Sequence, residues 1–215
     1  KMGQARIDPN FHHPNFDKLI KVLKKSKPEQ LGNIVEFSSE TWNPAEEKQT
    51  TFRYIEISAV NTQTGETTAE ELPVSEAPSR AKMMVKEGDI LISLTRPHRG
   101  AISLLGKDLD GCIASTGFTV IRKITKPNIL PEYLWAILRS PVCLRQLLQR
   151  SSGGNYPAIT DTELKQIFIP IPSIDVQKKV VKELKTRRAQ AHQLREEAER
   201  QWQEAKEKFE KALLG

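Results

Sequence analysis

The chain has 215 residues, of which 38% are hydrophobic, and its mean hydropathy is −0.49. No apolar run approaches the ~20 residues that a transmembrane helix needs, so the composition argues against an integral membrane protein. The net charge of +6 and the pI of about 9.3 permit an anionic partner such as a nucleic acid, without proving one.

The first half of the chain changes from a helical to a strand periodicity. Residues 16–23 place their apolar side chains on one helical face, and Asn15 is a candidate N-cap. The apolar period then becomes two, which predicts strands over residues 31–38 and 52–60. Residues 67–79 are mostly polar and include two prolines, so this stretch is expected to cross the surface of the domain.

The second half alternates short strands with short helices. Strands are predicted over residues 90–94, 101–105, 111–114, 118–121 and 167–169. Helices are predicted over residues 131–140 and 142–150, and a capping box at residues 160–163 opens a third, short helix. The expected fold is α+β, with a small mixed or antiparallel sheet and short helices forming one domain over residues 1–172.

A long helix is predicted over residues 173–215. Pro170 and Pro172 end the last strand, and about forty residues then run to Leu214 without proline or glycine, which corresponds to roughly 60 Å of helix. Alternating steps of three and four from Val181 mark a largely apolar stripe, as in a coiled coil. A solvated charged helix, or a tail that folds only on binding, remains the alternative. The residues expected to contact a partner helix are Val181, Leu184, Ala191, Ala198, Trp202 and Phe209.

Basic and polar loop residues are the candidates for nucleic-acid contact. Arg96, His98 and Arg99 share a loop between two apolar strands, where they can contact bases or phosphates. The loop of residues 151–156 could bring backbone N–H groups close to a phosphate. Flexible, solvated connectors are the alternative for both loops. The remaining candidates are Arg80, Lys82 and Lys123 for phosphate contact, and Ser152, Asn155 and Tyr156 in the second loop.

The sequence offers little support for catalysis. It contains neither a dinucleotide-binding glycine fingerprint nor a Gly-x-Ser-x-Gly elbow. A Glu-x-Lys spacing occurs at Glu163 and Glu183, but both lie in predicted helices, where these residue types are common. Cys112 and Cys143 are far apart in the sequence and read as reduced thiols of a cytoplasmic protein. We therefore expect no catalytic residues, no metal site and no cofactor in this chain.

The order of several motifs resembles the DNA-specificity subunit of type I restriction-modification systems. The motifs are residues 85–93, residues 115–118, residues 130–134, and the stretch from Gly154 through Gln177 into Val180 and Leu184. The last stretch is similar to the join at which an Ile-Pro-x-Pro segment closes a target recognition domain and a long spacer helix begins. The resemblance covers residues 16–213 and is strongest after Glu87.

This resemblance implies a DNA-binding module without chemistry of its own. The domain would read one half of a split site in double-stranded DNA, and the helix would pair antiparallel with a second such helix. A partner methyltransferase subunit would bring S-adenosylmethionine, and a restriction (motor) subunit, where one exists, would cut unmodified DNA.

The chain departs from the family pattern in one respect. A full-length subunit resembles two recognition domains and two helices, whereas this sequence has one of each. Two interpretations stay open: a half-length subunit that forms a homodimer through its helix, or part of a longer chain. A coiled-coil adaptor that binds a protein rather than DNA is the alternative function, and a steep salt dependence of DNA binding would argue against it.

Overall fold

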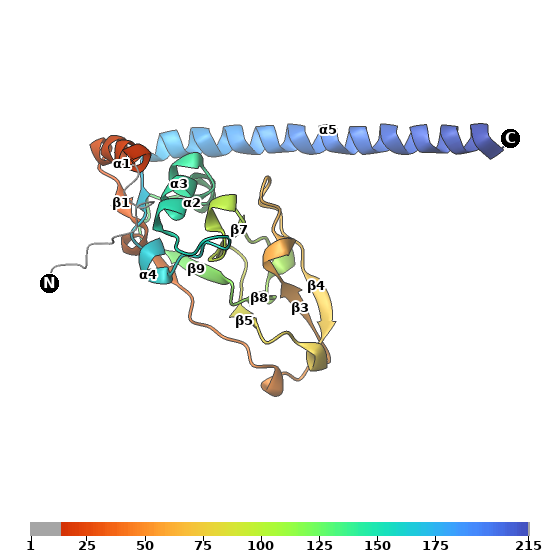
Figure 1. The fold of residues 1–215 in the computed structure, drawn as a ribbon, viewed down its shortest axis with the longest axis horizontal. Helices are drawn as coiled ribbons and strands as arrows, with labels where there is room; N and C mark the ends of the chain where they lie inside the picture. Colours follow the sequence, from red (N-terminus) through yellow and green to blue (C-terminus); the bar gives the residue numbers. More distant parts are fainter. Residues whose placement is uncertain (1–13, 215) are drawn as a thin grey trace.

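The computed structural model describes residues 14–214. A domain of short strands and short helices is followed by one long helix, which lies along the domain and continues well beyond it (Figure 1). Within these residues, no helix is both long and apolar enough to cross a membrane.

The first helix leads into a strand that joins the start of the domain to its end. Helix α1 (Pro14–Lys25) is followed by β1 (Glu29–Gln30), which pairs antiparallel with β10 (Phe168–Ile169). The predicted helix is confirmed, but it begins at Pro14. Asn15 is therefore the second residue of the helix and not the residue before it.

The first four-stranded sheet is antiparallel throughout. Its strand order is β2-β9-β6-β7. The central strands carry apolar residues on both faces because both faces are covered. The strands are β2 (Val35–Phe37), β9 (Phe118–Ile124), β6 (Ile90–Ser93) and β7 (Ile102–Leu104).

The second four-stranded sheet is mixed. Its order is β4-β3-β8-β5, and β3 pairs parallel with β8 while the other pairs are antiparallel. The short turn between β8 and β9 passes the chain from this sheet to the first. The strands are β4 (Glu70–Pro73), β3 (Thr51–Ile55), β8 (Ile113–Ser115) and β5 (Ala81–Met84).

Three helices cover one face of the first sheet and complete the main core. They are α2 (Pro131–Leu138), α3 (Pro141–Arg150) and α4 (Asp161–Leu164). Ile90 and Ile92 of β6 point into this core, whereas Leu91 points into a second core beside the other sheet. This alternation follows from the two-residue period of a strand, and it explains why the whole of β6 is buried.

Three segments differ from the predicted strands. Residues 31–38 form a short 3-10 turn before β2, because Gly32 packs closely against Lys165 and its N–H donates to the Lys165 carbonyl. Strand β3 ends at Ile55, and the stretch 67–79 contains β4. The 3-10 turns are η1 (Leu31–Asn33), η2 (Pro44–Glu46), η3 (Ile57–Ala59), η4 (Val74–Glu76), η5 (Pro97–Arg99) and η6 (Lys107–Leu109).

Helix α5 (Ile174–Leu214) is anchored to the domain at its beginning. Gln177 is completely buried, and its side chain bonds the backbone of three domain or linker residues. Val181 is 8% exposed in the main core, and Leu184 packs against the same core. The domain therefore covers Val181, which leaves it little surface for a partner helix, whereas Leu184 is only partly covered and its contact with a partner stays a prediction.

Candidate nucleic-acid interface

Two loops that are far apart in the sequence meet at one edge of the domain. The first, residues 95–100, follows β6, and the second, residues 151–158, follows α3. Thr95 and Ser152 each form a bridge with Ala158, which fixes the second loop beside the first. Pro97, within the first loop, is buried, and η5 packs against α3. Both loops thus rest on rigid elements, as recognition loops commonly do.

Arg96 is the residue that joins these loops. Its backbone N–H donates to the Pro157 carbonyl at 2.7 Å, and its Nη2 donates to the Asn155 carbonyl at 3.0 Å. Its guanidinium lies 4.0 Å from the centre of the Tyr156 ring, within the range of a cation–π interaction. Tyr156 is 70% exposed, so this arrangement lies at the surface. The structure therefore brings together three of the predicted contact residues.

The edge continues through the turn between the two sheets. The Gly117 carbonyl accepts from Leu94 N–H at 2.8 Å, and the Arg80 carbonyl accepts from Thr116 N–H at 2.8 Å. Gly117 packs against Ile57: an added Cβ would lie 2.5 Å from Ile57 Cδ1, so the isoleucine side chain would have to shift. We call the surface formed by residues 80, 94–99, 115–117 and 152–158 the recognition edge.

Lys82 and Arg99 differ in their exposure near this edge. Lys82 stands at the register shift between Ala81 and Met83, which is a β-bulge, and its side chain is half-buried. Arg99 is exposed, on the same loop as Arg96. Bulges reorient side chains and are common beside functional sites. Both cations are therefore placed on or next to the recognition edge.

His98 is less available than the sequence indicates. Its Nδ1 atom is buried and has no hydrogen-bond partner among the described residues. Burial, followed by the charges of Arg99 and Arg96, lowers the pKa of the imidazole below its usual range. The ring is therefore neutral at pH 7 and adds no charge to the recognition edge.

Lys123 lies away from the recognition edge. It is five residues along β9 from Phe118, which corresponds to roughly 17 Å of strand. Its Nζ pairs with Glu36 Oε1 at 3.3 Å across the β2–β9 pair, and both side chains are mostly exposed. The structure therefore does not group Lys123 with the other predicted contacts.

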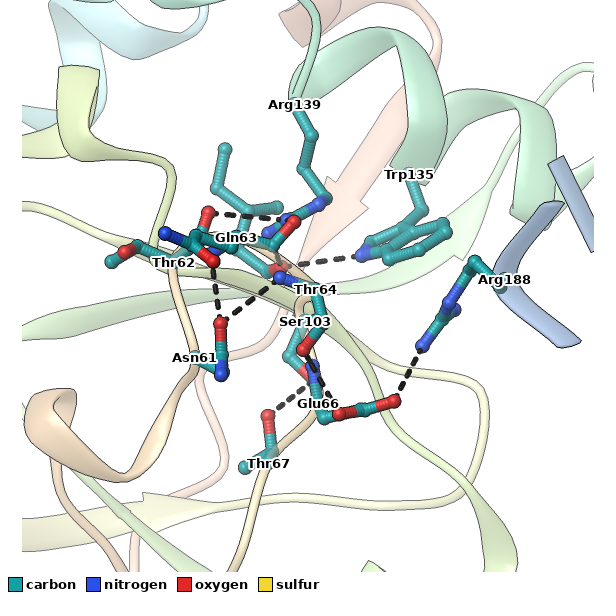
Figure 2. Close-up of polar contacts among 11 residues, drawn as sticks. Asn61, Thr62, Gln63, Thr64, Glu66, Thr67, Ser103, Trp135, Arg139 and Arg188 are labelled. Carbon is teal, nitrogen blue, oxygen red and sulfur yellow. Dashed lines mark hydrogen bonds and ion pairs between the residues drawn. The ribbon is translucent and has the colours of Figure 1, made fainter. Parts of the chain in front are cut away.

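A second polar cluster, not predicted from the sequence, lies where α5 leaves the domain. Arg139 donates to four backbone carbonyls, those of Gly100, Ile102, Thr62 and Gln63. Figure 2 shows this cluster, with Trp135 between Arg139 and Arg188. In the sequence, the only signal of this cluster is the four-residue spacing of Trp135 and Arg139, which places both side chains on one face of a helix. Among residues 14–214, no three His, Cys, Asp or Glu side chains are grouped to hold a metal ion.

Comparisons with known proteins agree on one family. The model of the type I restriction modification DNA specificity domain matches residues 24–200. The HindI specificity subunit of a type I restriction enzyme, from Haemophilus influenzae, is 34% identical over 113 residues, which are 50% of this chain and 24% of that protein.

Solved structures give the same result. The crystal structure of the HsdS subunit from Thermoanaerobacter tengcongensis matches with a TM-score of 0.66 and 32% identity, over 78% of this chain and 43% of that one. A chain from a structure of a type I R-M system matches with a TM-score of 0.66 and 34% identity, over 79% of this chain and 44% of that one. The chain spans less than half the length of each of these relatives. Because the family model matches most of its residues, the chain belongs to the type I restriction-modification DNA specificity family.

Proposed function

We propose that this chain is a DNA-reading module that gives a type I restriction-modification system its sequence specificity. The observation that carries the proposal is Arg96, which is held at the meeting point of two loops by Asn155 and Tyr156. A guanidinium that is positioned before binding can read guanine through two hydrogen bonds in the major groove. The domain would read one half of a bipartite site and have no chemistry of its own.

The cations around Arg96 support contact with phosphates. Arg80 and Arg99 are exposed at the recognition edge, and Lys82 lies at the adjoining bulge. Contacts of this kind supply affinity and register, whereas contacts with base edges supply sequence preference. The net charge of +6 also favours binding to the negatively charged phosphates.

The chemistry of the complex would belong to other subunits. We propose that a methyltransferase subunit docks on this chain and brings S-adenosylmethionine, and that a restriction subunit joins where the system has one. The similarity to a chain from a solved type I R-M system supports this assignment. The module would act in the cytoplasm, where the DNA is and where buried thiols such as Cys143 stay reduced.

The exposed stripe of α5 supports a homodimer. Trp202 is 62% exposed and Phe209 is 65% exposed, although both are large apolar side chains. Exposed apolar stripes on a long helix are normally covered by another helix. A second copy paired through this helix would supply the other half of a split site by twofold symmetry.

The size pattern of the stripe supports antiparallel pairing. Beyond residue 187, one core position of the heptad is always bulky and the other is always alanine. The bulky position holds Arg188, Arg195, Trp202 and Phe209, and the small position holds Ala191, Ala198, Ala205 and Ala212. A parallel pair would place bulky residues against their own copies and alanine against alanine. An antiparallel pair places each bulky residue against an alanine, which gives evenly filled layers.

The decisive experiment is to express this chain with the methyltransferase encoded beside it and to map adenine methylation in the DNA. A split, palindromic motif is expected, because two identical domains would read the two halves. Loss of methylation when this chain alone is omitted would assign the specificity to it. An asymmetric motif would contradict the homodimer but keep the specificity role, whereas unchanged methylation without this chain would overturn the proposal.

A further inference from the structure

The stripe of α5 faces a cavity where the helix passes the domain. The cavity has a volume of about 220 Å³ and lies between α5 and the loop of residues 61–67. Four successive stripe residues line it from the helix side, and Trp135 and Arg139 line it from the domain side. The four stripe residues are Leu184, Arg188, Ala191 and Arg195. A second helix that follows the stripe toward the domain therefore reaches this cavity.

The walls of the cavity are held firmly by the cluster in Figure 2. Arg139 ties the 61–67 loop to β7 through its four backbone carbonyl bonds, of which that to Gly100 is 2.7 Å long. Trp135 Nε1 donates to the Ile102 carbonyl at 3.2 Å. Arg188 lies 4.9 Å from the centre of the Trp135 ring and pairs with Glu66 at 3.6 Å. The cavity is thus formed before any partner arrives.

We propose that this cavity receives Phe209 from a second copy of the chain and thereby fixes the register of the helix pair. The inference rests on the antiparallel homodimer proposed above and adds to it the contact between each helix end and the partner's domain. In this register Phe209 faces Ala191, and Trp202 faces Ala198. Arg195 then faces Ala205, and Arg188 faces Ala212.

The domain excludes the neighbouring register on one side. Registers that keep a bulky residue against an alanine differ by one heptad. A shift toward the domain would place Phe209 over Leu184 and Ala212 over Val181. Val181 is only 8% exposed because the domain covers it, so no partner residue can lie there.

The neighbouring register on the other side moves Phe209 out of the cavity. There Phe209 would face Ala198, one heptad and ~10 Å along the helix from Ala191. In the proposed register, the exposed Phe209 ring enters a site lined by Trp135 and by four arginines, Arg139, Arg187, Arg188 and Arg195. Guanidinium groups over an aromatic ring attract it, and the attraction is larger when both are desolvated.

The register can be measured with spin labels on single-cysteine variants. Gln193→Cys and Glu207→Cys are both exposed and lie on the outer face of α5. The natural thiols Cys112 and Cys143 are 1% and 0% exposed, so the unmodified chain is the control for stray labelling. In the proposed register, residue 193 of one copy lies level with residue 207 of the other. Both variants therefore have the same axial label separation, ~21 Å from the helical rise.

Pulsed electron paramagnetic resonance should give equal label-to-label distances in the two homodimers. A one-heptad shift in either direction would make the axial separations unequal, ~10 Å and ~32 Å, which would overturn the register while leaving the dimer standing. A parallel pair would remove the axial separation in both variants, so that both distances would fall to the lateral spacing of the two outer faces, and a monomer would give no distance. Either of those results would overturn the proposed dimer together with the register.

Replacement of the docked side chain is the second test. Phe209→Ala should weaken dimerisation at least about tenfold, as for a buried aromatic anchor, and broaden the distance distribution of the label at residue 193. Glu207→Ala, two residues away on the outer face, is the matched control and should change neither. Equal behaviour of the two variants would contradict the docking of Phe209.

Discussion

At the scale of single residues, Arg96 combines an unusual backbone with a fixed side chain. Its φ of 48° lies in the left-handed region, which few residues other than glycine and asparagine adopt readily. Such conformations persist where surrounding contacts impose them, and they concentrate at functional sites. Here the contacts are the backbone bond to Pro157 and the side-chain bond to Asn155. The strain is consistent with a side chain positioned for recognition.

Arg96→Ala should change base preference, whereas Lys82→Ala should weaken binding to all sequences about equally. The reason is that a guanidinium can distinguish base edges, whereas a lysine that contacts phosphate cannot. We expect a loss of about 1–3 kcal/mol at one base position for Arg96→Ala. Binding to a set of single-base variants of the site, at fixed salt concentration, measures both effects. A uniform loss in both variants would make Arg96 a phosphate contact.

A buried ion pair lies at the end of the first sheet that is away from the recognition edge. Asp89 is 1% exposed, and its Oδ1 accepts from Arg122 Nε at 2.7 Å. Burial raises the pKa of the Asp89 carboxyl above its usual range, although the bonds from Lys86 N–H and Arg122 act in the opposite direction. Arg122 also reaches Glu40 at 3.0 Å, so it is the shared cation of two carboxylates.

Arg122→Met should destabilise the protein by about 3–5 kcal/mol at pH 7, because it leaves a buried carboxylate without its cation. Without that cation, the Asp89 pKa in the folded state rises further above its unfolded value. The folded variant is then favoured at low pH and loses stability as pH rises through the folded pKa, so the loss should be smaller at pH 5. Denaturant unfolding at both pH values measures this. Lys123→Met, the next residue on the same strand, breaks only an exposed pair and is the matched control.

At the scale of elements, Gln177 connects α5 to the domain. Its Oε1 accepts from Leu130 N–H at 3.0 Å, and its Nε2 donates to the carbonyls of Asn128 and Pro172 at 2.8 and 2.9 Å. The start of the helix is thus bonded to the segment that precedes α2 and to its own linker. This geometry gives the helix a fixed direction relative to the domain.

Gln177→Ala should cost about 2–4 kcal/mol of stability, since it leaves several polar backbone groups without partners. The first turns of α5 should also exchange their amide hydrogens faster. Gln190→Ala, an exposed residue of the same helix, is the control and should have almost no effect. Hydrogen exchange followed by mass spectrometry, together with thermal unfolding, tests both statements. Equal exchange in the two variants would show that Gln177 does not hold the helix.

The elements that could be predicted from sequence are those with strong internal periodicity. The long helix and the buried strand around Leu91 are of this kind, because their patterns repeat over enough residues to exclude other structures. Strand β4 is mostly exposed, and its pairing with β3 comes from tertiary contact, which local composition does not carry. The meeting of Arg96 with Asn155 has the same origin, because it joins loops about 60 residues apart.

At the scale of the whole molecule, the recognition edge and the stripe of α5 belong to one fixed body. The main core includes Val181 together with residues of the sheet and of α2, and Lys185 pairs with Glu132 at 2.9 Å. A change in how two α5 helices pair would therefore move the two recognition edges as units. This coupling makes the helix pair a determinant of which split sites are read.

Trp202→Ala tests that coupling, because it removes the largest side chain of the stripe without touching the domain. Trp202 is 62% exposed in the single chain and lies well beyond the residues that contact the core, so the folded domain should keep its thermal stability. Each dimer loses two aromatic anchors, and we expect the dissociation constant of the dimer to rise at least about tenfold. Sedimentation equilibrium measures this dissociation constant, with the exposed Gln203→Ala as the matched control.

The second readout is DNA binding at concentrations where only the Trp202→Ala variant is monomeric. The affinity of this variant for DNA carrying both half-sites should fall to its affinity for a single half-site, whereas the control should still bind the split site more tightly than a single half-site. Full affinity for the split site in a monomeric variant would show that one domain reads the whole sequence, and the helix would then need another role.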